Sequence, residues 1–179
     1  MTITNSSNLP PSFAGRPLSS EKDHVRVSFD LFQDDQGYPP ANSETMWAVP
    51  AGGSRFRLDN IPFFVRGVSC FDIIEARKEA SGCFKYARLL EASGHSTLRV
   101  IFCDQPSDPR SLQERVQELC KNLRELRCSS EISHIAGLIS VDVPPNVALA
   151  EVRPRVVPQP SGSAVPRQDF RQWTWPYPH

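Results

Sequence analysis

Alternating apolar and polar positions near the start of the chain predict a β-strand from His24 to Phe32. Apolar residues occupy every second position there, at Val25, Val27, Phe29 and Leu31. A strand with this pattern buries one face and leaves the other in water. Further strands are predicted on the same grounds at residues 43–49, 55–58, 83–92 and 97–103.

Small residues that favour turns separate these stretches. Ala51-Gly52-Gly53 supplies the positive φ angles of a hairpin turn, and Gly67 interrupts an apolar run where a sheet would bend. Ser93-Gly94 marks another turn. Five or six short antiparallel strands at this spacing predict a strongly bent antiparallel sheet or a small β-barrel.

The hydrophobic period changes once, where one long amphipathic helix is predicted. Ser107 or Asp108 can cap its N-terminus, and Pro109 suits its first turn. One apolar stripe follows, at Leu112, Val116, Leu119, Leu123 and Leu126. A strand is expected at residues 137–143, so residues 97–143 are interpreted as a β-α-β unit. The fold class is therefore α+β, with the bent sheet or barrel continued into that unit.

Proline, serine and asparagine concentrate towards the two ends of the chain. This distribution predicts a flexible N-terminal arm at 1–22 and a single α+β domain at 23–153. A short helix after the last strand should stop at Pro154, where a proline-rich linker, 154–168, begins. The last stretch, 169–179, is rich in aromatic residues and is expected to dock on the domain.

Composition excludes several function classes. The chain has 20 basic and 20 acidic residues, so no overall charge favours nucleic acid or an anionic membrane. The five cysteines contain no C-x-x-C pair, which argues against a zinc site or a disulfide framework. No apolar stretch is long enough for a membrane span, and the N-terminus lacks a signal-peptide pattern. We expect a cytoplasmic protein without metal or cofactor.

Several dispersed motifs resemble a bacterial family described only as a domain of unknown function (DUF4265). The motifs are WAVPAGGSRFRLDNIPFFVRGVSCFDII, LEASGHSTLRVIF, LISVDVPP and a closing Trp173-Thr174-Trp175. The resemblance covers roughly residues 25–147 and the last residues. Some relatives are thought to act as immunity proteins for secreted bacterial toxins, which implies a binding protein rather than an enzyme.

An acidic stretch supports the same interpretation. Between Val27 and Ser54 the chain has no lysine or arginine. The candidate partner-binding residues in this stretch are Asp30, Asp34, Asp35, Tyr38, Glu44 and Trp47. Acidic side chains with an aromatic anchor complement a basic protein surface, such as that of a nuclease toxin. The alternative is a solvated loop with no partner.

His95 carries the rival hypothesis of a small hydrolase or transferase. An imidazole can act as a general base at neutral pH, with Asp72 or Cys70 assisting. Neighbouring residues of a strand point to opposite faces, however, so Ser96 is poorly placed as its nucleophile. A structural role for His95 in the turn is the preferred interpretation. A single-stranded nucleic-acid binder ranks last, because Trp47 lies among acidic residues.

Overall fold

In the computed structural model, residues 24–102 and 109–156 are described. They form a closed five-stranded barrel, a three-stranded sheet and two helices, which confirms an α+β fold with a small β-barrel. The barrel strands are β1 (Val25–Asp30), β2 (Ser43–Pro50), β3 (Arg55–Leu58), β4 (Ile73–Lys78) and β5 (Phe84–Glu91). The elements that follow are β6 (Ser96–Ile101), α1 (Pro109–Glu125), β7 (Ser129–Ile132), β8 (Leu138–Val143) and α2 (Leu149–Val156).

Alternate side chains of the barrel strands fill the barrel interior. Val27 opposes Met46 across β1 and β2, and Phe56 opposes Ile74 across β3 and β4. All four side chains are buried in one apolar cluster, because successive residues of a strand point to opposite faces. Neighbouring strands run antiparallel except at the closure, where β1 pairs in parallel with β5.

The β2–β3 hairpin turns at the predicted glycines. Gly52 and Gly53 have φ angles of +94° and +60°, a region in which other residues are strained. The Ala51 N–H donates to the Arg55 carbonyl at 2.8 Å and closes the turn. The strand prediction and the turn prediction therefore agree with the structure here.

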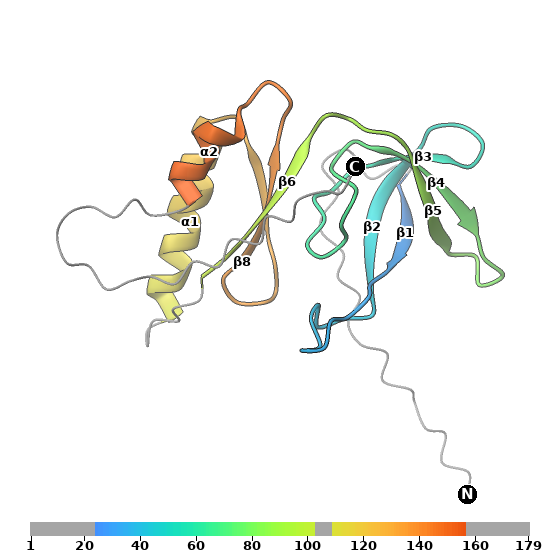
Figure 1. The fold of residues 1–179 in the computed structure, drawn as a ribbon, viewed down its shortest axis with the longest axis horizontal. Coiled ribbons are helices and arrows are strands. Elements are labelled where there is room, and N and C mark those ends of the chain that lie inside the picture. Colours follow the sequence, from blue (N-terminus) through green and yellow to red (C-terminus); the bar gives the residue numbers. More distant parts are fainter. Residues whose placement is uncertain (1–23, 103–108, 157–179) are drawn as a thin grey trace, which may run out of the picture.

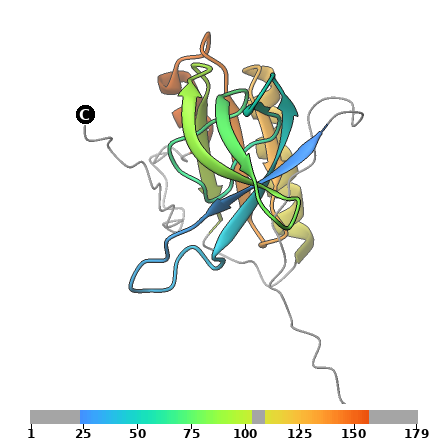
Figure 2. The same ribbon diagram turned by 90° about the vertical axis from the view of Figure 1, so that its right-hand side faces the viewer.

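The three-stranded sheet lies between the helices and the barrel (Figure 1). Seen from the barrel side, the barrel strands stand in front of this sheet, with the helices behind it (Figure 2). Strand β8 is the middle strand, between β6 and β7, and all six of its residues are buried. Its odd-numbered residues, Ile139, Val141 and Val143, join the core under the helices. Its even-numbered residues, Leu138, Ser140 and Asp142, face the barrel, at a contact that we call the seam.

Helix α1 covers the outer face of this sheet. Val116, Leu119 and Leu123 are buried there, and Leu112 and Leu126 pack against the same core cluster. These are the five positions of the predicted apolar stripe. No helix in the described ranges is long and apolar enough to cross a membrane.

Two elements differ from the sequence interpretation. Strand β7 follows α1 and was not predicted, because its Ser-Ser-Glu-Ile sequence contains only one apolar residue. Since β8 lies between β6 and β7 and runs antiparallel to both, residues 97–143 are not a simple β-α-β unit.

Pro154 does not stop the last helix, which was expected to end before it. It lies inside α2, where Val152 and Val156 are both buried. A proline removes one backbone hydrogen bond, and burial of two apolar side chains one turn apart offsets that loss. Residues 154–156 therefore belong to the domain and not to a linker. The predicted arm at 1–22, the rest of the linker and the segment 169–179 lie outside the described residues.

Candidate functional site

An irregular, buried stretch of the barrel is part of the seam. Residues 59–65, which we call the seam segment, follow β3 and are buried throughout. Glu44 of β2 holds this segment by three backbone bonds. The Phe63 N–H donates to its Oε1 at 2.7 Å, and the Phe64 and Val65 N–H groups donate to its Oε2, each at 2.8 Å.

Glu44 is therefore not a partner-binding residue, which corrects the sequence interpretation. Its side chain is 1% exposed. Burial raises the pKa of its carboxyl, although the three N–H donors and the Arg99 guanidinium act in the opposite direction. Its sequence position among acidic loop residues suggested a surface role, whereas its place on the inward face of β2 makes it structural.

The three-stranded sheet also holds the seam segment, because its side chains donate to the carbonyl groups of that segment. Arg99 of β6 donates from Nε to the Phe63 carbonyl at 2.6 Å and from a second nitrogen to the Val65 carbonyl. The Ser140 hydroxyl of β8 donates to the Pro62 carbonyl at 2.6 Å. The segment thus replaces a β-ladder with side-chain partners from both halves of the fold, as buried backbone groups require.

The β1–β2 loop, residues 31–42, has its own hydrogen-bond network. The Gln36 and Tyr38 N–H groups donate to Asp34 Oδ1 at 3.0 and 2.9 Å. The Gln33 side-chain amide donates to the Pro39 carbonyl at 2.8 Å, across a turn that contains a cis Tyr38–Pro39 bond. These bonds within the loop fix the conformation of its tip.

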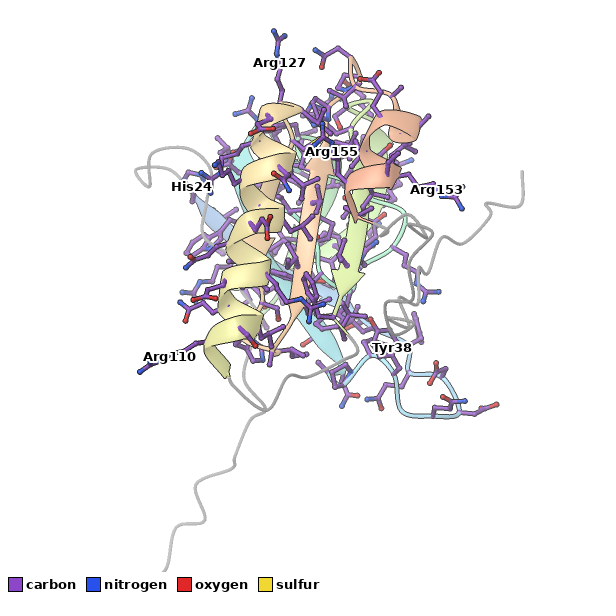
Figure 3. All side chains as sticks on the ribbon, turned by 90° about the vertical axis from the view of Figure 1, so that its left-hand side faces the viewer. His24, Tyr38, Arg110, Arg127, Arg153 and Arg155 are labelled. Atoms are coloured by element: carbon purple, nitrogen blue, oxygen red, sulfur yellow. The ribbon has the colours of Figure 1, made fainter. Side chains whose placement is uncertain are left out.

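This loop presents aromatic and acidic side chains to solvent. Phe32 is 91% exposed and Tyr38 is 45% exposed. The Tyr38 and Phe64 rings meet edge-on, with 6.1 Å between their centroids. Figure 3 shows Tyr38 where the loop leaves the body of the molecule. Asp34 and Asp35 are exposed beside them. The loop thus exposes two carboxylates of the predicted acidic stretch together with Phe32, an aromatic residue that the sequence analysis did not single out.

The sequence contained a signal for Phe32. The alternation of β1 buries Val27 and Phe29, with Leu31 partly buried on the same side. Phe32 therefore falls on the polar side of this alternation, where its apolar ring is exposed to water.

Two other predicted contact residues have different environments. Asp30 forms an ion pair with Lys85 of β5, with 2.9 Å between Oδ2 and Nζ, so its charge is partly neutralised at the surface. Trp47 is half-buried. The Arg26 guanidinium lies 4.8 Å from the Trp47 ring centroid, and the Trp47 backbone N–H donates to Asn60 Oδ1 at 2.9 Å. Trp47 packs on its own barrel, on a strand away from the loop tip, and is not a loop anchor.

His95 follows the Ser93-Gly94 turn and points into the seam. Its Nδ1 lies 2.9 Å from both carboxylate oxygens of Asp142, while Nε2 has no hydrogen-bond partner among the described residues. The imidazole is 17% exposed and Asp142 is 5% exposed. Burial raises the pKa of Asp142, and the bond to His95 opposes that rise. An ionised Asp142 keeps the proton on Nδ1, so Nε2 of the neutral ring carries a lone pair.

Asp72 was proposed as the assisting carboxylate, and the structure gives it another role. The Ser93 N–H donates to its Oδ1 and the Ser69 N–H to its Oδ2, both at 2.7 Å. These bonds tie the Ser69–Asp72 turn to the turn before His95. The partner of His95 is Asp142, which could have been suspected from an aspartate inside the apolar run LISVDV.

The Ser69–Asp72 turn is strained next to the imidazole. Phe71 has a φ of +66°, which is rare for a bulky residue, and its ring meets the His95 ring edge-on at 5.0 Å. Cys70 beside it is fully buried, and desolvation raises the pKa of its thiol well above the usual range. A thiol that stays protonated cannot serve as a nucleophile.

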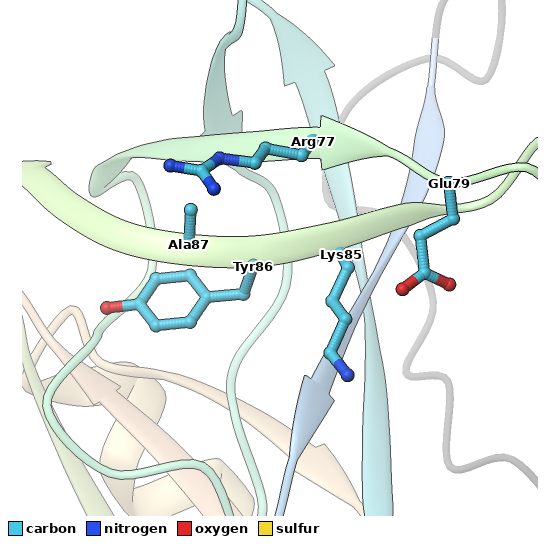
Figure 4. Close-up of a pocket in the computed structure, with 5 residues that line it drawn as sticks. All are labelled: Arg77, Glu79, Lys85, Tyr86 and Ala87. Atoms are coloured by element: carbon cyan, nitrogen blue, oxygen red, sulfur yellow. The ribbon is translucent and has the colours of Figure 1, made fainter.

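A shallow pocket of about 390 Å³ lies on the outer surface of the barrel (Figure 4). Its lining residues are Arg77, Glu79, Lys85, Tyr86 and Ala87. Lys85 is already paired with Asp30, and Tyr86 stacks on Phe29 of the barrel core at 4.5 Å. The Lys85 ammonium is thus held in an ion pair with Asp30, and its pKa is raised first by that bond. No cluster of three or more potential ligands for a metal ion occurs within residues 24–102 and 109–156.

Comparison with known proteins identifies a family. No curated protein matches the chain. A solved structure described as a hypothetical protein from Neisseria gonorrhoeae is similar, with a TM-score of 0.57 and 16% sequence identity over 75% of this chain and 84% of that chain. At this identity the likeness concerns the fold alone. The family model described as "Domain of unknown function (DUF4265)" matches residues 44–159. Because this match spans well over half of the chain, the protein belongs to the DUF4265 family.

Proposed function

We propose that the protein is a non-enzymatic inhibitor of the immunity type, which binds a basic partner protein through the β1–β2 loop. The observation that carries the proposal is Phe32, 91% exposed on a loop held by its own hydrogen bonds. An ordered aromatic side chain in water costs solubility, and a partner that buries it recovers that cost as binding energy.

Charge supports the choice of partner. Asp34 and Asp35 lie between Phe32 and Tyr38 in the chain, and no lysine or arginine occurs from Val27 to Ser54. Such a surface attracts a basic protein during diffusion and repels an acidic one. A secreted nuclease toxin is basic around its substrate groove, and an inhibitor of it would act in the cytoplasm.

Asp35→Lys is the sharpest charge test, because Asp35 is exposed and Asp34 also holds the loop conformation. The tagged chain would be used to capture and purify its partner from host lysate. Association would then be timed at low and high salt. We expect Asp35→Lys to slow association roughly three- to tenfold at low salt, with a smaller effect at high salt.

The matched control is Glu118→Lys, an equal charge change on the exposed side of α1. It should leave association unchanged. Equal association rates for Asp35→Lys and Glu118→Lys would show that this loop is not the contact surface.

A second candidate function rests on the His95–Asp142 pair. An imidazole oriented by a carboxylate at Nδ1, with Nε2 open, has the arrangement of a general base. No side-chain hydroxyl is bonded to Nε2 among the described residues, so such a base would act on water or on a substrate hydroxyl. The missing nucleophile is the reason this candidate ranks second.

His95→Ala separates the two candidates. If His95 is a base, the variant should lose hydrolysis of activated esters or phosphodiesters by about 100-fold or more while it retains partner binding. Identical rates for the native chain and His95→Ala on p-nitrophenyl acetate and bis(p-nitrophenyl) phosphate would remove the enzymatic candidate.

A further inference from the structure

The seam contains a further carboxylate, the half-buried Glu131 of β7, whose two oxygens have unequal surroundings. Oε1 accepts a hydrogen bond from the Ile61 N–H at 2.9 Å. Oε2 is buried and has no hydrogen-bond partner among the described residues, and the same holds for Nδ2 of the fully buried Asn60. A carboxylate with one buried, unpaired oxygen is far costlier when ionised than when protonated.

The groups around Glu131 do not compensate its charge. The charges that act on Glu131 are those of Glu44 on β2 and Asp59 on the seam segment, and both are negative. Glu131 in turn helps to raise the pKa of the buried Cys70 thiol, which is raised mainly by desolvation. His24 already pairs with Asp59, with 2.6 Å between Nε2 and Oδ2. The other charges of the seam are likewise committed: Arg99 binds the Phe63 and Val65 carbonyls, and Asp142 binds His95.

These surroundings set the direction of the titration. Desolvation first, and then repulsion by Glu44 and Asp59, raises the pKa of Glu131 to about 7, against the effect of the Ile61 N–H. The folded protein therefore holds a proton on Glu131 at pH values where the unfolded chain, with an ordinary carboxyl pKa of 4.5, has released it.

We propose that the contact between the barrel and the three-stranded sheet is proton-linked through Glu131. The seam is tight while the carboxyl is protonated, and it loosens when ionisation adds a negative charge that Glu44 and Asp59 repel. Loosening begins at the bond between β7 and Ile61, because opening there admits water to Oε2. This inference does not depend on the proposed binding function.

Unfolding of the full chain as a function of pH tests the proposal. A folded-state pKa above the unfolded-state pKa gives stability that is complete below about pH 4.5 and is lost as the pH rises through about 7. For the native chain we expect the folding equilibrium constant to fall by about two orders of magnitude between roughly pH 5 and pH 9. Glu131→Gln cannot ionise and should lose this part of the pH dependence, so that it is the more stable protein above pH 7.

Glu118→Gln on the exposed side of α1 is the matched control and should keep the native pH dependence. Hydrogen exchange at the Ile61 amide, corrected for its intrinsic pH dependence, should show opening that increases above pH 7 in the native chain and not in Glu131→Gln. If the stability of the native chain and that of Glu131→Gln depended on pH in the same way, the proposal would be overturned. If Glu131→Gln does not fold, the Glu131 carboxyl of the native chain can be titrated directly by carbon-detected NMR. An ordinary carboxyl pKa in that titration would also overturn the proposal.

Discussion

Glu44→Ala should lower the free energy of unfolding by about 3–5 kcal/mol. The substitution leaves the N–H groups of Phe63, Phe64 and Val65 buried without an acceptor, at roughly 1–3 kcal/mol for each unsatisfied group. Removal of the buried carboxylate also relieves its own desolvation, which reduces the total below the simple sum. Because small domains are stable by only about 5–15 kcal/mol, this one change would remove much of the folded population.

Chemical denaturation of three variants measures this effect. Glu44→Gln keeps one acceptor oxygen and should lose less stability than Glu44→Ala, which gives a measurable value if the alanine variant does not fold. Asp35→Ala removes an exposed carboxylate from the same acidic stretch and should stay within about 0.5 kcal/mol of the native chain. Equal stability of Glu44→Ala and Asp35→Ala would contradict the structural role of Glu44.

Phe32→Ala should have the opposite profile, with little effect on folding and a large effect on binding. Phe32 is 91% exposed, so its truncation removes almost no packing, and the free energy of unfolding should change by less than about 0.5 kcal/mol. In a complex that buries the ring, the substitution should cost about 2 kcal/mol or more of binding free energy, which corresponds to roughly a 30-fold weaker affinity. Titration calorimetry with the captured partner would measure it.

Ile132→Ala provides the comparison for that experiment. Ile132 is 58% exposed on β7, outside the loop, and its truncation should leave the affinity unchanged. If Phe32→Ala and Ile132→Ala both bound the partner as tightly as the native chain, Phe32 would not contact the partner and the proposed binding surface would be wrong.

Much of the barrel could be predicted from local pattern. Strand β1 and the Gly52-Gly53 hairpin were recognisable because one face of each barrel strand is apolar and the turn needs positive φ angles. Strand β7 and the irregular seam segment could not be predicted in this way. The former is nearly all polar, and the latter is apolar yet forms no ladder, because side chains of other elements satisfy its backbone.

The candidate site was predictable only in part. Asp34, Asp35 and Tyr38 are exposed on the loop as interpreted, whereas Glu44 is buried and Trp47 packs on the barrel. His95 was recognised as a turn neighbour, but its partner Asp142 lies 47 positions further along the chain. Pairing of this kind depends on which strands become neighbours, and no short-range pattern carries that information.

Periodicity along the chain was sufficient to establish which residues share a face of a strand, since alternation follows from backbone geometry alone. Whether a polar face meets water was decided by the packing of one layer on another. Arg99, Glu131 and Asp142 occupy alternate positions of their strands, which in a single-layered sheet would be solvated. Here the barrel covers that face, so Arg99 and Glu131 bond to the backbone of the seam segment and Asp142 bonds to His95.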